Sequence, residues 1–337
     1  MISLKKIFMV VLLCLCSQTI FAQNKYAGEF LSIGVGGRPL GMGGAYVALV
    51  NDVTAGYWNP ASLSRINYPQ FSLMHDERFG NLINYDYGSV GIPFGKNASL
   101  GFSIIRMGID DIADTRNALI DLNGNGILDP GERLDEDKIS YFNSSDYAFY
   151  FTYSKKQSDK FSYGANLKIL RRNIAESSAW GLGFDVGVNY NPFGRFFLGA
   201  NLQDLTTTYL SWSTGKKETI TPTAKIGTAY SIDALGGFIT PAVDFDVRFE
   251  GRKESANANL GNVSFDMHAG LEYSFKNLIS VRTGYNDLGN LTLGAGVKLP
   301  KINIDYSFAK FDGTDQLGNT HRISLVFTLE EEKFQRK

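Results

Sequence analysis

One twelve-residue stretch has the residue types and spacing of a calcium-binding loop. Residues 121–132 read DLNGNGILDPGE, which matches D-x-[DN]-x-[DN]-G-x5-E at each fixed position. Oxygen ligands at alternate positions wrap one hard cation, and the glycine at the sixth position permits the sharp turn. Five side chains and one backbone carbonyl (that of Ile127) are the expected ligands, from Asp121, Asn123, Asn125, Ile127, Asp129 and Glu132.

The same stretch has a simpler interpretation, a polar Asn/Gly/Asp turn that binds nothing. No amphipathic helix clearly flanks it, so it would be a free-standing loop. Because two asparagines replace aspartates, the ligand charge is low, which corresponds to the weak class of sites with affinities of about 10⁻⁴–10⁻³ M. We expect a structural calcium ion that orders a long outer loop.

The three histidines do not suggest catalysis. His75, His268 and His321 each fall on an expected strand or at its edge, with no serine or carboxylate at a telling spacing. His268 shares a polar strand face with Asp266 and Glu272, which favours a hydrogen-bonded position inside a barrel. A hydrolase needs a nucleophile, a base and an orienting group that converge in space. Nothing in the sequence proposes one, and we do not expect an enzyme.

Alternation of apolar and polar residues predicts the elements that position these groups. Residues 180–190 read WGLGFDVGVNY, and such a period of two places apolar side chains on one face of a strand. Most segments of this kind exceed the usual 5–6 residues of soluble strands and match the roughly 9–11 that cross a bilayer at a tilt. Fourteen strands are expected, at residues 69–78, 82–93, 97–107, 145–155, 160–173, 179–191, 195–204, 221–233, 237–250, 263–275, 278–287, 290–299, 301–311 and 320–328.

The connections are sorted by length. Those after even-numbered strands are short, and those after odd-numbered strands are generally longer, as at 108–144, 205–220 and 251–262. Short turns on one rim, long loops on the other and an even strand number are typical of bacterial outer-membrane barrels. A soluble propeller would show a blade repeat of about 40–50 residues, which is not found. The expected fold is all-β, a transmembrane antiparallel β-barrel of about 14 strands with an N-terminal plug segment, in the cell outer membrane.

The N-terminus and the composition agree with export. Residues 1–22 have two lysines, an unbroken apolar run at 7–16 and a small residue, Ala22, before the expected cleavage point, as in secretion signals. Both cysteines, Cys14 and Cys16, lie in this run, and the bulky residues before them argue against lipid attachment. No later run of 18 apolar residues occurs, which excludes a helical membrane protein. The formal net charge of -1 gives no sign of nucleic-acid binding.

These patterns divide the chain into four parts. A signal peptide at 1–22 precedes a plug at 23–68 that does not alternate, and the barrel follows at 69–329 with the outer insertion 108–144. A charged tail at 330–337 extends past the last strand. The plug contains a glycine-rich run at 34–45 that matches neither phosphate-binding glycine pattern, and its small residues would allow a short helix to pack against the barrel wall.

The plug also carries a specific resemblance. Residues 36–66, GGRPLGMGGAYVALVNDVTAGYWNPASLSRI, resemble the N-terminal signature of the PorV/PorQ family of outer-membrane proteins, which are related in fold to the FadL transporters. The resemblance implies that six residues belong to a plug inside the lumen near the periplasmic rim. These are Arg38, Gly41, Gly43, Gly44, Asn59 and Pro60. The alternative is that they only hold the plug in place.

Three functions follow as hypotheses. The resemblance implies a non-catalytic role in type IX protein secretion and surface attachment, in which the outer loops bind secreted cargo or secretion-system proteins. The second hypothesis is a FadL-like channel for hydrophobic small molecules with the plug gating the lumen, and the third is an outer-membrane hydrolase. The inward strand faces are rich in Gly, Asp, Asn, Ser, Thr and Lys, which favours the first hypothesis. Outer-membrane lipid is a partner in each case.

Overall fold

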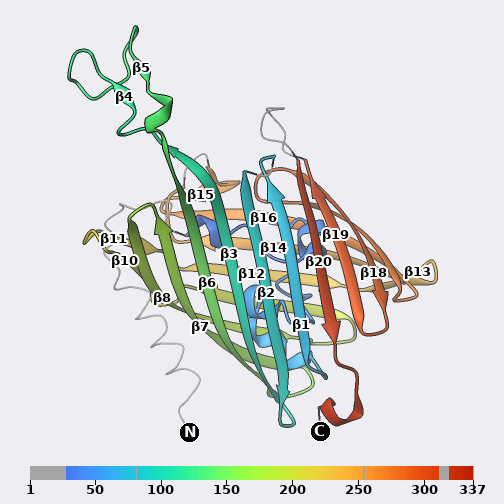
Figure 1. Cartoon of the computed structure of the whole chain (residues 1–337). Helices are drawn as coiled ribbons and strands as arrows, with labels where there is room; N and C mark the ends of the chain where they lie inside the picture. The colour runs from blue at the N-terminus through green and yellow to red at the C-terminus, as the bar shows by residue number, and fades with distance from the viewer. Residues whose placement is uncertain (1–27, 81, 253–254, 311–318, 337) are drawn as a thin grey trace.

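The computed structural model describes residues 28–80, 82–252, 255–310 and 319–336 (Figure 1). The expected signal peptide at 1–22 lies outside the described residues. No helix in the described part of the chain is long and apolar enough to cross a membrane.

The chain is a closed antiparallel β-barrel of 14 strands, as predicted. The barrel closes because β1 pairs with β2 on one side and with the last strand, β20, on the other. The wall segments are β1 (Gln70–Arg78), β2 (Ile83–Phe94), β3 (Ala98–Asp114), β6 (Ser140–Lys156), β7 (Phe161–Ile174), β8 (Ser177–Tyr190), β9 (Phe196–Gln203), β10 (Thr208–Trp212), β11 (Lys217–Ile220), β12 (Thr223–Tyr230), β13 (Ile232–Ala234), β14 (Gly237–Arg248), β16 (Val263–Phe275), β17 (Ile279–Tyr285), β18 (Leu291–Leu299), β19 (Ile302–Ala309) and β20 (Thr320–Thr328). Three of these segments, β10, β11 and β13, are short additions to the wall, and the other 14 are the barrel strands. A further short strand, β15 (Ala258–Leu260), pairs with the start of β16.

The prediction of an outer loop at residues 205–220 is wrong for most of that range. Residues 208–220 of the expected loop 205–220 form the hairpin β10–β11, which extends the wall above β9 and β12. Pairing with β8 stops at Leu202 and resumes at Tyr209. The residues between them bulge, with positive φ at Asp204 (54°) and Thr207 (59°). This bulge interrupts the alternation, which is why the sequence pattern ends there.

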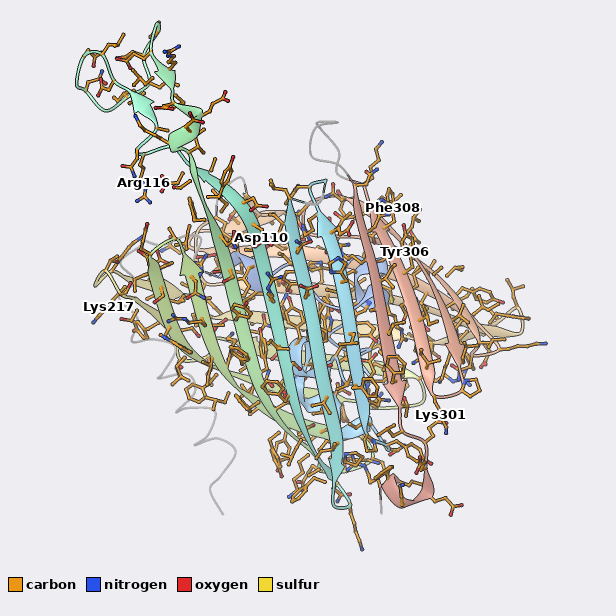
Figure 2. All side chains as sticks on the ribbon, in the orientation of Figure 1. Asp110, Arg116, Lys217, Lys301, Tyr306 and Phe308 are labelled. Carbon is orange, nitrogen blue, oxygen red and sulfur yellow. The ribbon has the colours of Figure 1, made fainter. Side chains whose placement is uncertain are left out.

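The outer insertion is an arm that stands clear of the barrel (Figure 1). β3 and β6 remain paired as far as Asp114 and Ser140, so the two strands reach into the expected insertion 108–144 from both ends. The arm beyond them carries β4 (Leu119–Ile120), β5 (Arg133–Leu134) and the short helix η3 (Glu136–Lys138). Figure 2 places Arg116 at the base of the arm and Lys301 at the opposite rim. We call these the outer and the periplasmic rim, since long loops face outward in such barrels.

The outside of the wall is apolar. Along β8, exposed and buried residues alternate, and the exposed ones include Trp180, Leu182 and Phe184. A closed barrel leaves no unpaired strand edge, and an apolar outer surface is stable in lipid but not in water. The chain is therefore an outer-membrane barrel.

The segment before β1 lies inside the lumen, where it packs against the inner face of the wall. Its described part, residues 28–69, contains four short helices, η1 (Glu29–Leu31), α2 (Gly37–Gly41), α3 (Ala55–Trp58) and η2 (Pro60–Arg65). The C-terminal tail, with η5 (Glu332–Phe334), folds back under it. There the Arg336 guanidinium donates to the carbonyl oxygens of Ser64 and Ile66.

Inward-facing glycines of the wall receive this plug. We call them the glycine belt, because a Cβ at any of them would lie within 3.3 Å of a plug atom. The belt consists of Gly91, Gly101, Gly164, Gly187, Gly199, Gly227, Gly270, Gly284 and Gly294. Backbone approaches this close are possible only where the wall has no side chain. The belt surrounds the plug, so the plug is built into the wall.

Candidate functional site

The plug separates two spaces in the lumen. On the outer side is a cavity of about 320 Å³, which we call the luminal cavity. At the periplasmic rim is a vestibule of about 860 Å³, lined by polar residues such as Arg38, Asp52 and Arg65. The luminal cavity is a candidate ligand site, because enclosed spaces with a few convergent polar groups are typical binding sites.

The floor of the luminal cavity is aromatic and aliphatic. Phe30, Leu40, Tyr57 and Trp58 of the plug line it, together with Met107 of β3. Tyr57 and Trp58 pack edge to face, with ring centroids 5.0 Å apart. Trp58 Nε1 donates to the Val35 carbonyl at 2.9 Å, which fixes the indole. The floor is therefore a preformed apolar surface.

The upper wall of the cavity is cationic. Arg78 and Arg322 share one carboxylate, since their guanidinium nitrogens lie 3.5 and 2.8 Å from Asp76 Oδ2. Arg248 and Arg252 share Asp266 in the same way. Each group of two arginines and one aspartate has a formal charge of +1. The cavity lining includes five Arg/Lys side chains, including Lys225, and two carboxylates, Glu29 and Asp287.

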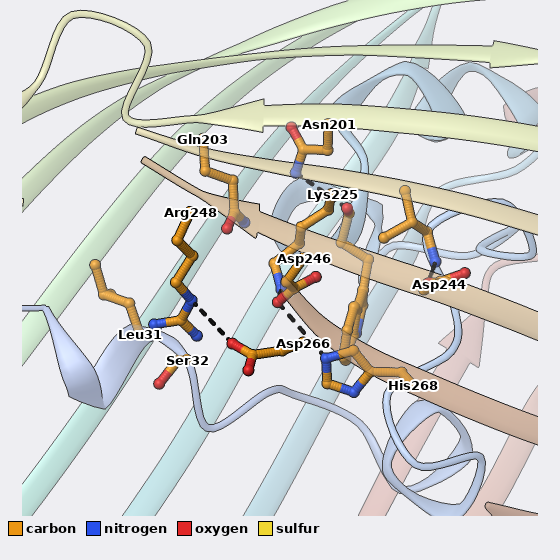
Figure 3. Close-up of polar contacts among 12 residues, drawn as sticks. Leu31, Ser32, Asn201, Gln203, Lys225, Asp244, Asp246, Arg248, Asp266 and His268 are labelled. Atoms are coloured by element: carbon orange, nitrogen blue, oxygen red, sulfur yellow. Dashed lines mark hydrogen bonds and ion pairs between the residues drawn. The ribbon is translucent and has the colours of Figure 1, made fainter. Parts of the chain in front are cut away.

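Lys225 and His268 continue the polar wall (Figure 3). Lys225 pairs with Asp246, and His268 Nε2 lies 3.6 Å from the same carboxylate. His268 Nδ1 donates to the Gly43 carbonyl of the plug at 2.8 Å. Among the described residues, neither His268 Nε2 nor Arg248 Nε has a hydrogen-bond partner, although both are buried. Two side-chain nitrogens at the cavity thus have unused hydrogen-bonding capacity.

The six plug-motif residues belong to the plug and lie where it contacts the wall. Arg38 Nε and Nη2 each lie 2.8 Å from a carboxylate oxygen of Glu272 on β16. Gly41 packs on Gly294, and a Cβ at Gly43 would meet the Tyr285 backbone at 2.6 Å. These contacts anchor the first half of the plug to β16, β17 and β18.

The rest of the motif anchors the second half. Asn59 Nδ2 donates to the carbonyls of Val47 and Val188, and Pro60 begins η2 where Gly164 leaves room for it. Gly44 has a φ of 88° beside the His268 ring. Of the six motif residues, Gly43 and Gly44 line the luminal cavity and Arg38 lines the vestibule.

The expected calcium ligands lie together in the arm. Asp121 accepts backbone N–H bonds from Gly124 and Gly126 at 2.6 and 2.7 Å. Glu132 accepts from the backbone of Leu122 and Asp129. The Asn123 and Asn125 amides both donate to Asp129 at 2.7 Å. In the described part of the chain, no group of three His, Cys, Asp or Glu side chains has the arrangement of a metal site.

The luminal cations were not among the site residues predicted from the sequence. Arg78 follows Asp76 by two residues near the outer end of β1, and Arg248 follows Asp246 by two residues near the outer end of β14. Acid–base pairs at a spacing of two on the polar strand face are the signal that would have pointed to them. This signal is weak, because polar residues are expected on every inward strand face.

Comparison with solved structures agrees with this architecture. The toluene transporter TbuX of Ralstonia pickettii aligns over 88% of this chain and 98% of its own, with a TM-score of 0.59 and 13% identity. The P. putida toluene transporter TodX has a TM-score of 0.62, 12% identity and coverages of 89% and 99%. A Pseudomonas aeruginosa FadL homologue has a TM-score of 0.55, 12% identity and coverages of 88% and 98%.

These neighbours are named as transporters and as a FadL homologue, and at this identity they show a shared fold. No protein-family model and no curated protein matches the sequence.

Proposed function

We propose that this chain is an outer-membrane channel that takes up small amphipathic molecules with an apolar body and an acidic group. The observation that carries the proposal is the luminal cavity, with its aromatic floor and its cationic upper wall. The names of the structural neighbours, two of them toluene transporters, support a channel for small molecules with an apolar body.

The acidic group follows from the charge of the lining. An apolar molecule alone would gain nothing from Arg248, Arg322 and Lys225. A carboxylate would receive charge-assisted hydrogen bonds, which are stronger than those between neutral groups. Its apolar body would cover Tyr57 and Trp58 and leave water.

Only a short stretch of the plug separates the luminal cavity from the vestibule. Leu40, Gly43 and Gly44 line the luminal cavity, while Arg38 lines the vestibule. A shift of α2 and the two residues after it would join the two spaces while the rest of the plug stayed seated. Glycines with positive φ at Gly36 and Gly44 flank this segment, and they give it the hinges that such a shift needs.

Binding tests the proposal. Intrinsic tryptophan fluorescence of the detergent-solubilised barrel, titrated with an alkyl carboxylate, should saturate. We expect Arg248→Gln to bind the carboxylate about tenfold more weakly, because it loses one charge-assisted hydrogen bond, and to bind the corresponding alcohol as the parent does. Arg171→Gln, which removes an arginine stacked on the outward Trp180, is the matched control. Equal carboxylate affinity in parent and Arg248→Gln would contradict the proposed role of the cationic wall.

A second candidate function is the binding of secreted or surface proteins, which the PorV/PorQ resemblance implies. The observation in its favour is the arm, which stands clear of the barrel (Figure 1) and exposes Leu122, Ile127 and Leu128. The neighbours support the channel more than this role. Uptake of a carboxylate into proteoliposomes that is unaffected by deletion of the arm, residues 115–139, would favour the channel over partner binding.

We also propose that the arm binds one calcium ion through residues 121–132. The pKa of Asp121 is lowered, chiefly because the Gly126 N–H donates to its carboxylate, so this group is ionised at neutral pH. Calcium at millimolar concentration should protect the arm from protease in the parent but not in Glu132→Gln. Glu136→Gln, in η3 just outside the motif, should behave as the parent. Cleavage that is indifferent to calcium in the parent would refute the proposal.

A further inference from the structure

The lipid-facing side of the wall carries a recess with an apolar floor. It has a volume of about 600 Å³ and lies over β1, β2, β3 and β20. Leu73, Ile104 and Leu325 surround Gly88, which has no side chain to fill the space. A Cβ at Gly88 would meet the side-chain carbons of Ile104 at 3.5 Å and Leu73 at 3.8 Å. The recess thus exists because this outward position is a glycine.

Charged groups of neighbouring strands form the rim of the recess. His75 of β1 lies opposite Asp86 of β2, which in turn lies opposite Arg106 of β3. His75 Nδ1 is 2.7 Å from Asp86 Oδ1, and Arg106 Nη1 is 3.3 Å from Asp86 Oδ2. Glu77 adds a second carboxylate 3.5 Å from His75 Nε2. All of these side chains are at least 34% exposed.

The strand register places the floor and the rim of the recess at different depths in the membrane. Leu73, Gly88 and Ile104 are paired in one row. The rim residues His75, Asp86 and Arg106 occupy the next outward-facing row toward the outer end of β1, and Glu77 lies one row further. β1 ends at Arg78, three residues beyond His75. Charged side chains that face lipid are tolerated near the interface and are costly at the midplane. The rim therefore lies at the depth of head groups in the outer leaflet, and the floor lies at the depth of acyl chains.

We infer that this recess binds one zwitterionic phospholipid, with an acyl chain over Gly88 and the head group on the rim. The rim presents both signs of charge within one hydrogen-bonded row. Arg106 can donate to the phosphate, as can the protonated form of His75, and Glu77 and Asp86 can accept from the ammonium group. A purely anionic head group would meet two carboxylates and one permanent cation, so the charges favour the zwitterion. The inference depends on the outer-membrane location and not on what passes through the lumen.

Native mass spectrometry of the full chain tests this inference. The purified barrel is loaded with phosphatidylethanolamine, phosphatidylglycerol or lipopolysaccharide, and retained lipid is counted. The parent should retain one phosphatidylethanolamine. Gly88→Leu fills the recess and should bind it about tenfold more weakly, since roughly two methylenes lose their burial. Ala295→Leu, which adds a similar side chain at another outward position of the wall, should retain the affinity of the parent.

A second variant separates the head group from the acyl chain. Arg106→Gln should lower the preference for phosphatidylethanolamine over diacylglycerol, which has no phosphate. Heat-modifiable mobility in gels shows that each variant has folded. Equal lipid retention by Gly88→Leu and the parent would overturn the inference. Stronger retention of phosphatidylglycerol or lipopolysaccharide than of phosphatidylethanolamine would also overturn it.

Discussion

Replacing Gly284 by valine is expected to unseat the plug and make the barrel conduct ions. A Cβ at this position would lie 2.2 Å from the carbonyl carbon of Met42 and 2.3 Å from the nitrogen of Gly43. These are backbone atoms, which cannot rotate away as the end of a side chain can. β17 is paired with β16 and β18 along its length, so the plug must move rather than the wall. Overpacking of this kind costs about 1–3 kcal/mol.

Two measurements report this change. Planar-bilayer recordings should show little conductance for the parent and sustained openings for Gly284→Val, and protease should cleave the plug only in the variant. Thr283→Val is the matched control, since Thr283 is the preceding residue of β17 and faces outward. A Gly284→Val barrel that is as closed and as resistant as the parent would show that the glycine belt does not seat the plug.

Replacing Lys168 by methionine is expected to destabilise the folded barrel by about 3–5 kcal/mol, because it leaves buried carboxylates without their cation. Lys168 Nζ lies 2.6 Å from Asp204 Oδ1 and 3.2 Å from Asp185 Oδ1. The lysine side chain is 2% exposed and that of Asp185 is fully buried. Asp204 belongs to the wall bulge, and its backbone N–H also donates to Asp185 at 2.9 Å. The lysine therefore holds the bulge against β7 and β8.

The measurement is the temperature at which the barrel loses its compact mobility in denaturing gels. Lys168→Met should unfold at a clearly lower temperature, and Asp204→Asn in the same chain should restore part of the loss by removing one unpaired charge. Arg171→Met, on the same strand but with an outward side chain stacked on Trp180, should change the temperature little. Unaltered heat resistance of Lys168→Met would contradict the role assigned to this ion pair.

Much of the wall could be predicted from the sequence because lipid and lumen impose opposite demands on successive residues. The predicted strands 263–275 and 320–328 coincide with β16 and β20, and most other strand ends differ by one or two residues. The exceptions lie where that demand is absent. β3 continues to Asp114 and β6 starts at Ser140, beyond the membrane, where both faces of a strand meet water. The bulge before β10 hid the β10–β11 hairpin for a related reason, since it shifts the pairing register.

The site was less predictable than the wall. Sequence alternation places Gly284 and Gly187 on the inward face, but it does not tell whether plug backbone or open space lies opposite. Likewise, the inward position of Arg248 does not reveal that Arg252 shares its carboxylate, because that pairing depends on how the loop after β14 folds back. Contacts between segments far apart in the sequence determine the luminal cavity, and periodicity carries no information on them.

The most direct test of the central claim is whether an amphipathic carboxylate occupies the luminal cavity against Trp58. The measurement is fluorescence quenching by a carboxylate with a brominated tail, in a chain with Trp180→Phe and Trp212→Phe so that Trp58 alone reports. We predict saturable quenching that an unbrominated carboxylate reverses and that Arg248→Gln weakens. Quenching that rises linearly with concentration, without competition, would show that the carboxylate does not bind in the cavity.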